Sequence, residues 1–193
     1  MLHLRASDTR VMPWKDGGGS TTELAIEPAG ATVAEPFLWR ISSARVEASG
    51  PFSRFPSHRR ILALLEGAGF ILDLEGEGRL RLKQVKQCLE FSGAPAAHAT
   101  LIQGPCRDFS LIYDATRVKG TVEVLTLGPD ATSLALRETT LIYAPKSPVG
   151  VDPLGVEMAV GEVLRFDGEA GTKLGLRAPS GEAMAVIVHL VRA

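Results

Sequence analysis

Short apolar segments recur along the whole chain, and glycine or proline residues separate most of them from the next. The 193 residues include 20 glycines and 12 prolines, which are spread along the sequence rather than gathered in one linker. Evenly spaced short segments of this kind are typical of an all-β sandwich or barrel. The predicted strands are 23–27, 37–46, 61–65, 70–74, 80–85, 87–91, 109–113, 121–127, 133–136, 139–143, 163–166, 173–177 and 184–191.

Two of these segments predict how the strands are buried. In residues 79–83 arginine or lysine alternates with leucine, which predicts a strand with one face on a core and the other in solvent. Residues 184–191 are almost continuously apolar, which indicates a strand buried on both faces. The most helix-like segment, 61–66, stops at Gly67 after less than two turns, so we expect no long helix.

A polar stretch near the middle of the chain suggests a division into halves. Residues 115–120 form the least apolar segment between the predicted strands of that region. A boundary there gives two comparable halves, residues 1–115 and 116–193, although no residue-level repeat relates them.

The charge balance excludes several classes of protein. The 21 lysines and arginines against 22 acidic residues give a net charge of −1, which argues against binding to nucleic acid or to an anionic membrane. No apolar run approaches the roughly 20 residues of a membrane-spanning helix, and the first residues lack the apolar stretch of a signal peptide. Cys88 and Cys106 are too few for a disulfide framework or a four-thiolate zinc site. We therefore expect a cytoplasmic protein whose cysteines are small buried residues.

The segment Trp-Lys-Asp-Gly-Gly-Gly at residues 14–19 is the most unusual stretch. A phosphate-binding loop is disfavoured, because Lys15 precedes the glycines and no G-K-[S/T] ending follows. Two interpretations stay open. The segment is either a hairpin or bulge in which Trp14 plugs the end of a barrel, or a flexible rim whose Lys15 and Asp16 point at a small polar ligand.

The predicted strand 37–46 places Arg40 and Ser42 on the same face. Small side chains beside an arginine leave room for an anionic group that the guanidinium can hold in a bidentate manner. The alternative is that Arg40 pairs with a carboxylate of a neighbouring strand, such as Glu23 or Asp108.

Other patterns give no sign of a metal or of nucleophilic catalysis. The four histidines show no H-x-H or H-x₃-H spacing, and no G-x-S-x-G nucleophile elbow is present. We expect no cofactor. Arg60 is open to the same two interpretations as Arg40. If the chain is an enzyme, Asp16 and Asp108 are the first candidates for a general base.

Four stretches together carry a family resemblance. They are Met-Pro-Trp-Lys-Asp-Gly-Gly-Gly at 12–19, Trp-Arg-Ile-Ser at 39–42, Gly-Pro-Phe-Ser-Arg-Phe-Pro at 50–56 and Gly-Pro-Cys-Arg-Asp-Phe at 104–109. This set resembles the HutD/Ves family of small bacterial bicupin-like proteins, over about residues 1–125. The resemblance implies a double cupin-like (bicupin) β-barrel that folds as one compact unit. Neither half shows the H-x-H…E pattern of the usual cupin metal ligands.

The sequence departs from the family pattern at polar positions. Asp16 and Ser110 stand where asparagine is usual, Arg59 where an acidic residue is common, and Ala94 near a usual acidic position. The scaffold residues match better, which is consistent with a different ligand or a divergent subgroup.

The resemblance implies a link with histidine utilisation and with a small organic acid such as N-formylglutamate or urocanate. We predict a metal-free binding protein for such an acid, with no nucleic-acid or membrane partner. The predicted ligand-binding residues are Trp14, Lys15, Asp16, Arg40, Ser42, Arg60 and Asp108. Two alternatives stay open: an enzyme acting on a small organic acid, and a structural or protein-interaction β domain. Barrels of this kind can pair through edge strands, which would give a homodimer.

Overall fold

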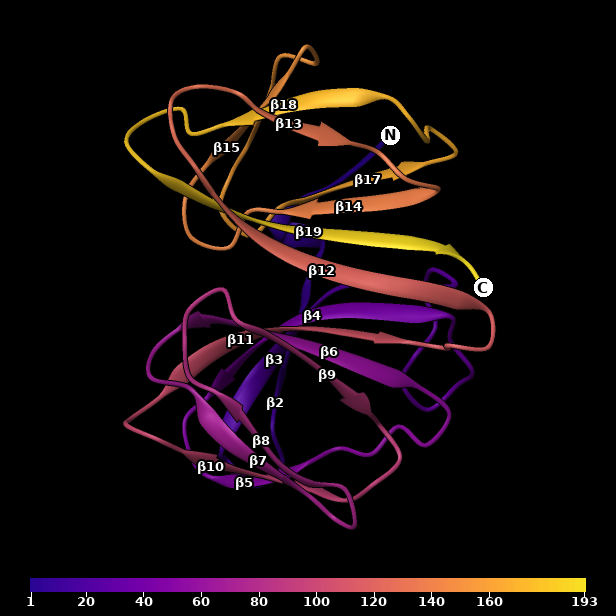
Figure 1. The fold of residues 1–193 in the computed structure, drawn as a ribbon, viewed down its shortest axis with the longest axis vertical. Helices are drawn as coiled ribbons and strands as arrows, with labels where there is room; N and C mark the ends of the chain where they lie inside the picture. Colours follow the sequence, from indigo (N-terminus) through magenta and orange to yellow (C-terminus); the bar gives the residue numbers. More distant parts are fainter. The chain divides into compact units, whose positions relative to one another are not determined.

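The computed structural model describes residues 1–193, and β-strands make up nearly all of its regular structure (Figure 1). Each of the thirteen predicted segments contributes to a strand, and the only helical element is the 3₁₀ turn Ala6–Asp8. The prediction of an all-β chain without long helices is confirmed. The structure contains no helix with the length and apolar character needed to span a membrane.

Tertiary contacts divide the chain into two compact units. One unit consists of residues Arg10–Val118 with the last residue, Ala193, and the other combines Met1–Thr9 with Lys119–Arg192. The chain passes between them after Val118, close to the predicted boundary at 115/116. The first nine residues differ from the prediction, because β1 (Leu2–Leu4) pairs antiparallel with β17 (Val163–Asp167). A three-residue strand has too short a pattern to show this long-range pairing in the sequence.

The 10–118 unit contains two antiparallel sheets, which Figure 1 shows as two layers. The larger sheet has the order β2 (Arg10–Pro13), β3 (Gly19–Glu27), β4 (Trp39–Val46), β11 (Cys106–Tyr113), β6 (Arg59–Glu66), β9 (Cys88–Ser92). The smaller sheet has the order β5 (Gly50–Phe52), β10 (Ala97–Leu101), β7 (Phe70–Leu74), β8 (Gly78–Leu82).

The core of the 10–118 unit lies between its two sheets. Val46, Leu62 and Leu64 of the larger sheet share one apolar cluster with Phe70 and Leu72 of the smaller sheet. All five side chains are fully buried. Face-to-face packing of two sheets over such a cluster is a β-sandwich, and the two sheets do not join into one closed barrel.

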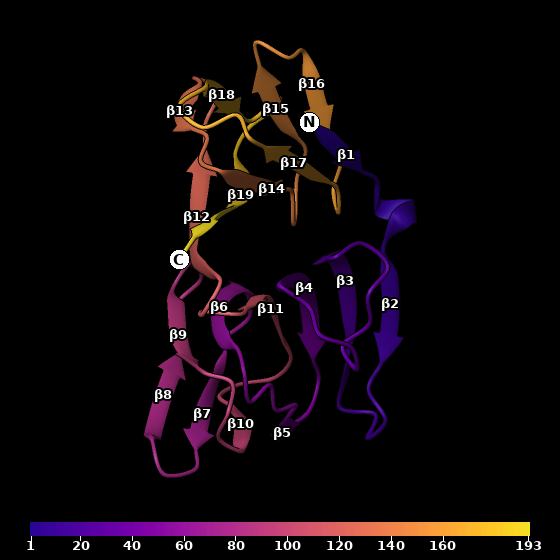
Figure 2. The ribbon, with the colours of Figure 1, turned by 90° about the vertical axis from the view of Figure 1, so that its right-hand side faces the viewer.

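The 119–192 unit, with the first nine residues, repeats the two-sheet plan. Its larger sheet has the order β1, β17, β14 (Thr139–Tyr143), β19 (Ala183–Arg192), β12 (Val118–Leu127), and Figure 2 shows β1 beside β17. Its smaller sheet has the order β13 (Thr132–Ala135), β18 (Lys173–Arg177), β15 (Val149–Asp152), β16 (Val156–Met158). The neighbouring residues Ile187 and Val188 of β19 are both fully buried, so the prediction of a strand buried on both faces is confirmed.

The half-buried strand at 79–83 is also confirmed, because Leu82 is buried whereas Arg79 and Arg81 are exposed. Six strands were not predicted: β1, β2, β5, β10, β15 and β16. Each has three to five residues. Strands this short are specified by their pairing partners more than by their own sequence pattern. β5 is also hard to predict because it contains Pro51, which argues against a strand but is tolerated at the edge of a sheet, where β5 lies.

Candidate functional site

A cavity of about 580 Å³ lies in the 10–118 unit, and all seven predicted ligand-binding residues line it. The hairpin between β2 and β3 supplies Trp14, Lys15 and Asp16 at the rim, while strands β4, β6 and β11 supply the rest. The other lining residues are Met12, Pro13, Thr21, Val33, Ala44, Pro51, Phe52, Ser53, Phe55, Ser110 and Ile112.

Strand register explains why the polar side chains share one face. Ile112 of β11 lies opposite Arg40 of β4 on one side and opposite Arg60 of β6 on the other. Ser110 lies opposite Ser42 in the next row. Residues directly opposite on antiparallel strands point to the same face of a sheet, so these side chains all point between the two sheets of the sandwich. The cavity is therefore a polar end of an otherwise apolar interior.

Arg40 is buried and paired. Only 6% of the residue is exposed, and its Nε donates a hydrogen bond to Glu23 Oε2 at 2.6 Å. The interpretation that Arg40 pairs with a neighbouring-strand carboxylate is therefore correct, with Glu23 as the partner. The guanidinium also borders the cavity, so it adds donors there while its charge is balanced by Glu23.

Arg60 is equally buried but incompletely paired. It is 7% exposed, one terminal nitrogen donates to the Ser53 carbonyl at 3.1 Å, and its Nε has no hydrogen-bond partner. The guanidinium carbon lies 5.4 to 5.5 Å from the ring centres of Phe52, Phe55 and Phe91, within cation–π range. Burial lowers the pKa of Arg60 to about 10, against the opposing effect of the Asp108 charge. Arg60 therefore stays protonated near neutral pH.

Asp108 and Ser110 add two further unpartnered groups. Asp108 is 1% exposed, and neither its Oδ2 nor the Ser110 Oγ has a hydrogen-bond partner. Burial raises the pKa of Asp108 to about 7, although the Arg60 charge acts in the opposite direction. Buried polar groups are usually hydrogen-bonded because an unsatisfied one costs free energy. Three such groups around one cavity indicate a site that a polar ligand would satisfy.

Ser110 was not among the predicted site residues. It follows Asp108 by two positions, so strand alternation places both on one face, and this signal was present in the sequence. The aromatic neighbours Phe52 and Phe55 lay within the family-like stretch 50–56 but were not predicted to line the site. From the sequence, Glu23 is predicted only as a partner for Arg40.

The glycine-rich segment combines features of both of its interpretations. Trp14 Nε1 donates to Thr21 Oγ1 at 2.8 Å, which holds the indole against the hairpin. Lys15 and Asp16 are exposed at the rim, and the Asp16 carboxylate accepts the main-chain N–H two residues further on at 2.9 Å. A side chain at Gly19 would place its Cβ 2.1 Å from a backbone carbonyl oxygen of β4. The hairpin is therefore a turn fixed by hydrogen bonds, and its charged residues Lys15 and Asp16 border the cavity.

The histidines make contacts within the fold. His58 Nε2 lies 3.0 Å from the Phe37 carbonyl oxygen, and its ring stacks on Phe37 at 4.3 Å. His189 contacts Thr140 Oγ1 through Nδ1 at 3.0 Å. The structure brings together no group of three or more His, Cys, Asp or Glu side chains in a position to hold a metal ion. The residues present do not fit a cupin metal centre.

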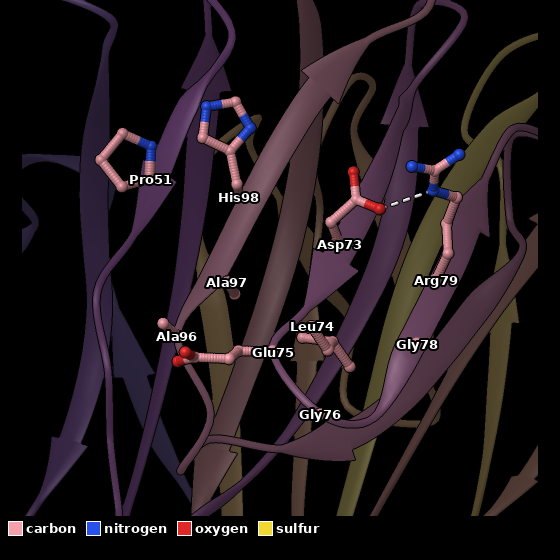
Figure 3. Close-up of a pocket in the computed structure, with 10 residues that line it drawn as sticks. All are labelled: Pro51, Asp73, Leu74, Glu75, Gly76, Gly78, Arg79, Ala96, Ala97 and His98. Carbon is pink, nitrogen blue, oxygen red and sulfur yellow. Dashed lines mark hydrogen bonds and ion pairs between the residues drawn. The ribbon is translucent and has the colours of Figure 1, made fainter.

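A second depression, of about 800 Å³, lies on the outer face of the smaller sheet (Figure 3). Strand register aligns Pro51, His98, Asp73 and Arg79 in one row across β5, β10, β7 and β8, and Figure 3 shows Asp73 turned toward Arg79. Asp73 Oδ1 accepts from Arg79 Nε at 2.5 Å, and both side chains are about half exposed. Because these charges satisfy each other in solvent, the depression lacks the unpartnered buried groups of the cavity.

Comparison with known proteins identifies the family. The family model for HutD matches residues 6–185. An uncharacterised 21.2 kDa protein in the hutC 3′ region of Pseudomonas putida is 34% identical over 170 residues, which cover 86% of each chain. The Protein Ves of Escherichia fergusonii is 33% identical over 121 residues, which cover 61% of each chain.

Solved structures agree with this assignment. HutD from Pseudomonas fluorescens superposes with a TM-score of 0.79 at 31% identity, over 100% of this chain and 98% of that one. The oxalate decarboxylase of Lactobacillus farciminis is similar in fold alone, with a TM-score of 0.69 at 7% identity over 100% of this chain and 88% of that one. The predicted bicupin-like fold is confirmed, with the difference that the sheets form β-sandwiches and do not close into true barrels. The match over most of the chain shows that this protein is a member of the HutD family.

Proposed function

We propose that the protein binds a small carboxylate metabolite in the 580 Å³ cavity without a metal ion, and that binding serves a regulatory role in histidine utilisation. The observation that carries the proposal is Arg60, a buried cation that lines the cavity and whose Nε has no hydrogen-bond partner. N-formylglutamate and urocanate are the first candidate ligands.

The chemistry of the cavity favours an anion with an apolar body. Burying a carboxylate is costly unless a cation and hydrogen-bond donors meet it, and Arg60 Nε and Ser110 Oγ are donors without partners. Lys15 adds a cation at the rim, where the neighbouring Asp16 offsets its charge. The rings of Phe52 and Phe55 offer apolar surface beside the charged groups.

Two relatives support this choice of ligand class. The Pseudomonas putida relative is named for its place in the hutC 3′ region. The Pseudomonas fluorescens HutD structure is described as a formate condition, and formate is the smallest carboxylate. A carboxylate of the histidine utilisation route fits both descriptions.

Calorimetric titration with N-formylglutamate, urocanate and formate tests the proposal. We expect at least one of the acids to bind, and we expect Arg60→Met to weaken that binding by at least about 30-fold, since losing one partner of a buried charged contact costs roughly 2–5 kcal/mol. Arg59→Met is the matched control. Arg59 precedes Arg60 on β6, points to the opposite face and pairs with Glu90 at 3.1 Å. No heat with any acid at millimolar concentration, or equal losses in both variants, would refute the proposal.

A second candidate function is acid–base catalysis by Asp108 on such an acid. The observation that favours it is buried Asp108, whose pKa of about 7 is where a general base works best at neutral pH. Asp16, the other sequence-based candidate, is exposed and already accepts a main-chain hydrogen bond. Proton NMR of the bound acid in D₂O distinguishes the two functions, because a general base acting at carbon would exchange hydrogens next to the carboxylate and a binding protein would not.

A further inference from the structure

Asp108 is a carboxyl group in a cavity whose other features favour an anion. It is 1% exposed, its Oδ2 has no hydrogen-bond partner, and no ion pair includes it. It stands two residues from Ser110 on the same face of β11, about 7 Å along the strand. An anion that uses the Arg60 Nε and Ser110 Oγ donors therefore has to lie close to Asp108.

Two ionised carboxylates close together in one cavity repel each other, and such pairs ordinarily share a proton. We propose that the cavity takes up one proton together with its anion, and that Asp108 holds this proton and donates it to the bound carboxylate as a hydrogen bond. This inference rests on the proposed function. It adds that the ligand is recognised as a carboxylate by a neutral carboxylic acid as well as by Arg60.

The step balances without any further reactant. Ionised Asp108 takes one proton from solvent, an O–H bond forms on its carboxyl group, and the ligand enters as the anion. The resulting O–H donates to a ligand oxygen. No other bond forms or breaks, and the net charge of the cavity is the same before and after binding.

The charges that face Asp108 are consistent with this role. Arg60 on β6 and Arg40 on β4 are the cations of the neighbouring strands, and Glu23 on β3 already balances Arg40. Lys15 and Asp16, of opposite sign, stand together at the rim. Cys106 on the same strand is buried, and burial together with the Asp108 charge raises the pKa of its thiol to about 12, so it is neutral.

These groups leave Arg60 as the one cation that stabilises ionised Asp108, and an incoming anion competes for it. Burial nevertheless raises the pKa of Asp108 to about 7 before any ligand binds. A second negative charge beside it raises that pKa further, so the bound state holds the proton over a wider range of pH.

Titration of the whole protein with sodium formate at pH 6, 7, 8 and 9 tests the inference, with calorimetry in two buffers of different ionisation enthalpy. Formate stays ionised over this range. We expect a constant Kd below pH 6.5, a rise of about tenfold for each pH unit above pH 7.5, and uptake of about one proton at pH 8, since free Asp108 is then mostly ionised. Asp108→Asn keeps a neutral donor in the same place, so its Kd should not change with pH.

Asp73→Asn is the matched control, because Asp73 is about half exposed and lies outside the cavity. It should follow the wild-type pH profile. A wild-type Kd that stays constant from pH 6 to 9 would refute the proton uptake while leaving carboxylate binding intact. A tenfold rise that persists in Asp108→Asn, or loss of formate binding by folded Asp108→Asn at every pH, would also refute it. Failure of the wild-type protein to bind formate at any pH would refute this inference, whereas the proposed function would be refuted only if N-formylglutamate and urocanate also failed to bind.

Discussion

The ligand-free stability of the protein should depend on pH through Asp108. Its pKa is about 7 in the folded chain against an ordinary value of 3.8, because the carboxyl group is buried. One pKa unit corresponds to about 1.4 kcal/mol, so ionising Asp108 costs the fold about 4 kcal/mol. Asp108 is 1% exposed, so solvent screening does not reduce this figure as it would at the surface. Asparagine has nearly the shape of the neutral acid and cannot ionise.

Proton linkage determines whether stability rises or falls with pH. The folded pKa is raised, so the contribution of Asp108 to stability is fully present below pH 3.8, where folded and unfolded chains both carry the proton. As pH rises from 3.8 to about 7 the unfolded chain releases its proton first, and stability falls through this window. Above pH 7 both states are ionised and the loss is constant. Asp108→Asn should therefore gain stability relative to the wild-type protein between pH 4 and 8, by up to about 4 kcal/mol.

Urea unfolding followed by tryptophan fluorescence measures this difference. Both tryptophans, Trp14 and Trp39, belong to the 10–118 unit, so the signal reports on the unit that contains Asp108. Asp73→Asn, which breaks an exposed ion pair with Arg79, should change the free energy of unfolding by less than about 1 kcal/mol at every pH. A difference between wild type and Asp108→Asn that is the same at pH 4 and 8, or a variant that is less stable at pH 8, would show that burial does not disfavour the ionised carboxylate.

Two further predictions concern the backbone and the thiols of the same unit. Gly19→Ala should destabilise the unit by several kcal/mol, because the new Cβ would meet the Arg45 carbonyl oxygen at 2.1 Å. Gly17→Ala has open space and a φ of +73°, so it should cost only about 1 kcal/mol in the same urea titration. Cys106, buried with its pKa raised to about 12, should resist iodoacetamide at pH 8 while the half-buried Cys88 reacts. Mass spectrometry of the folded protein measures the alkylation of each thiol, and equal rates for Cys106 and Cys88 would contradict the prediction.

The long strands and the face of the site could be predicted because strand alternation is a local property. Spacing alone placed Arg40 and Ser42 on one face, and the observed register confirms that arrangement. The same rule applied to β11 would have added Ser110. The three-residue strands could not be predicted because they depend on long-range pairing. A strand such as β1 forms only because it pairs with the edge of the sheet at β17.

The partner of Arg40 could not be chosen from the sequence, because the choice depends on register. Glu23 and Asp108 both lie on strands that neighbour β4. Glu23 faces Ser42, and the register between β3 and β4 shifts between Glu23 and Ala25. A bulge of this kind changes which side chains lie close together, and the sequence of the segment contains no residue that predicts it. The structure therefore distinguishes the two arginines, which the sequence alone could not do.

That distinction between the arginines is the strongest argument for a ligand. An arginine that serves only the fold has its charge balanced and its nitrogens bonded, as the pair Arg40–Glu23 shows. Arg60 instead keeps its charge among three aromatic rings while Nε stays unbonded. Removing one partner of a buried charge pair is costly because the other charge is left uncompensated, so Arg60→Met is compared with the wild-type protein at pH 5, where Asp108, with its pKa of about 7, is neutral. Under this condition Arg60→Met should change the free energy of unfolding by no more than about 1–2 kcal/mol while it weakens carboxylate binding. A loss of more than about 3 kcal/mol in urea unfolding would mean that Arg60 supports the sandwich itself, and the case for a ligand at this position would fail.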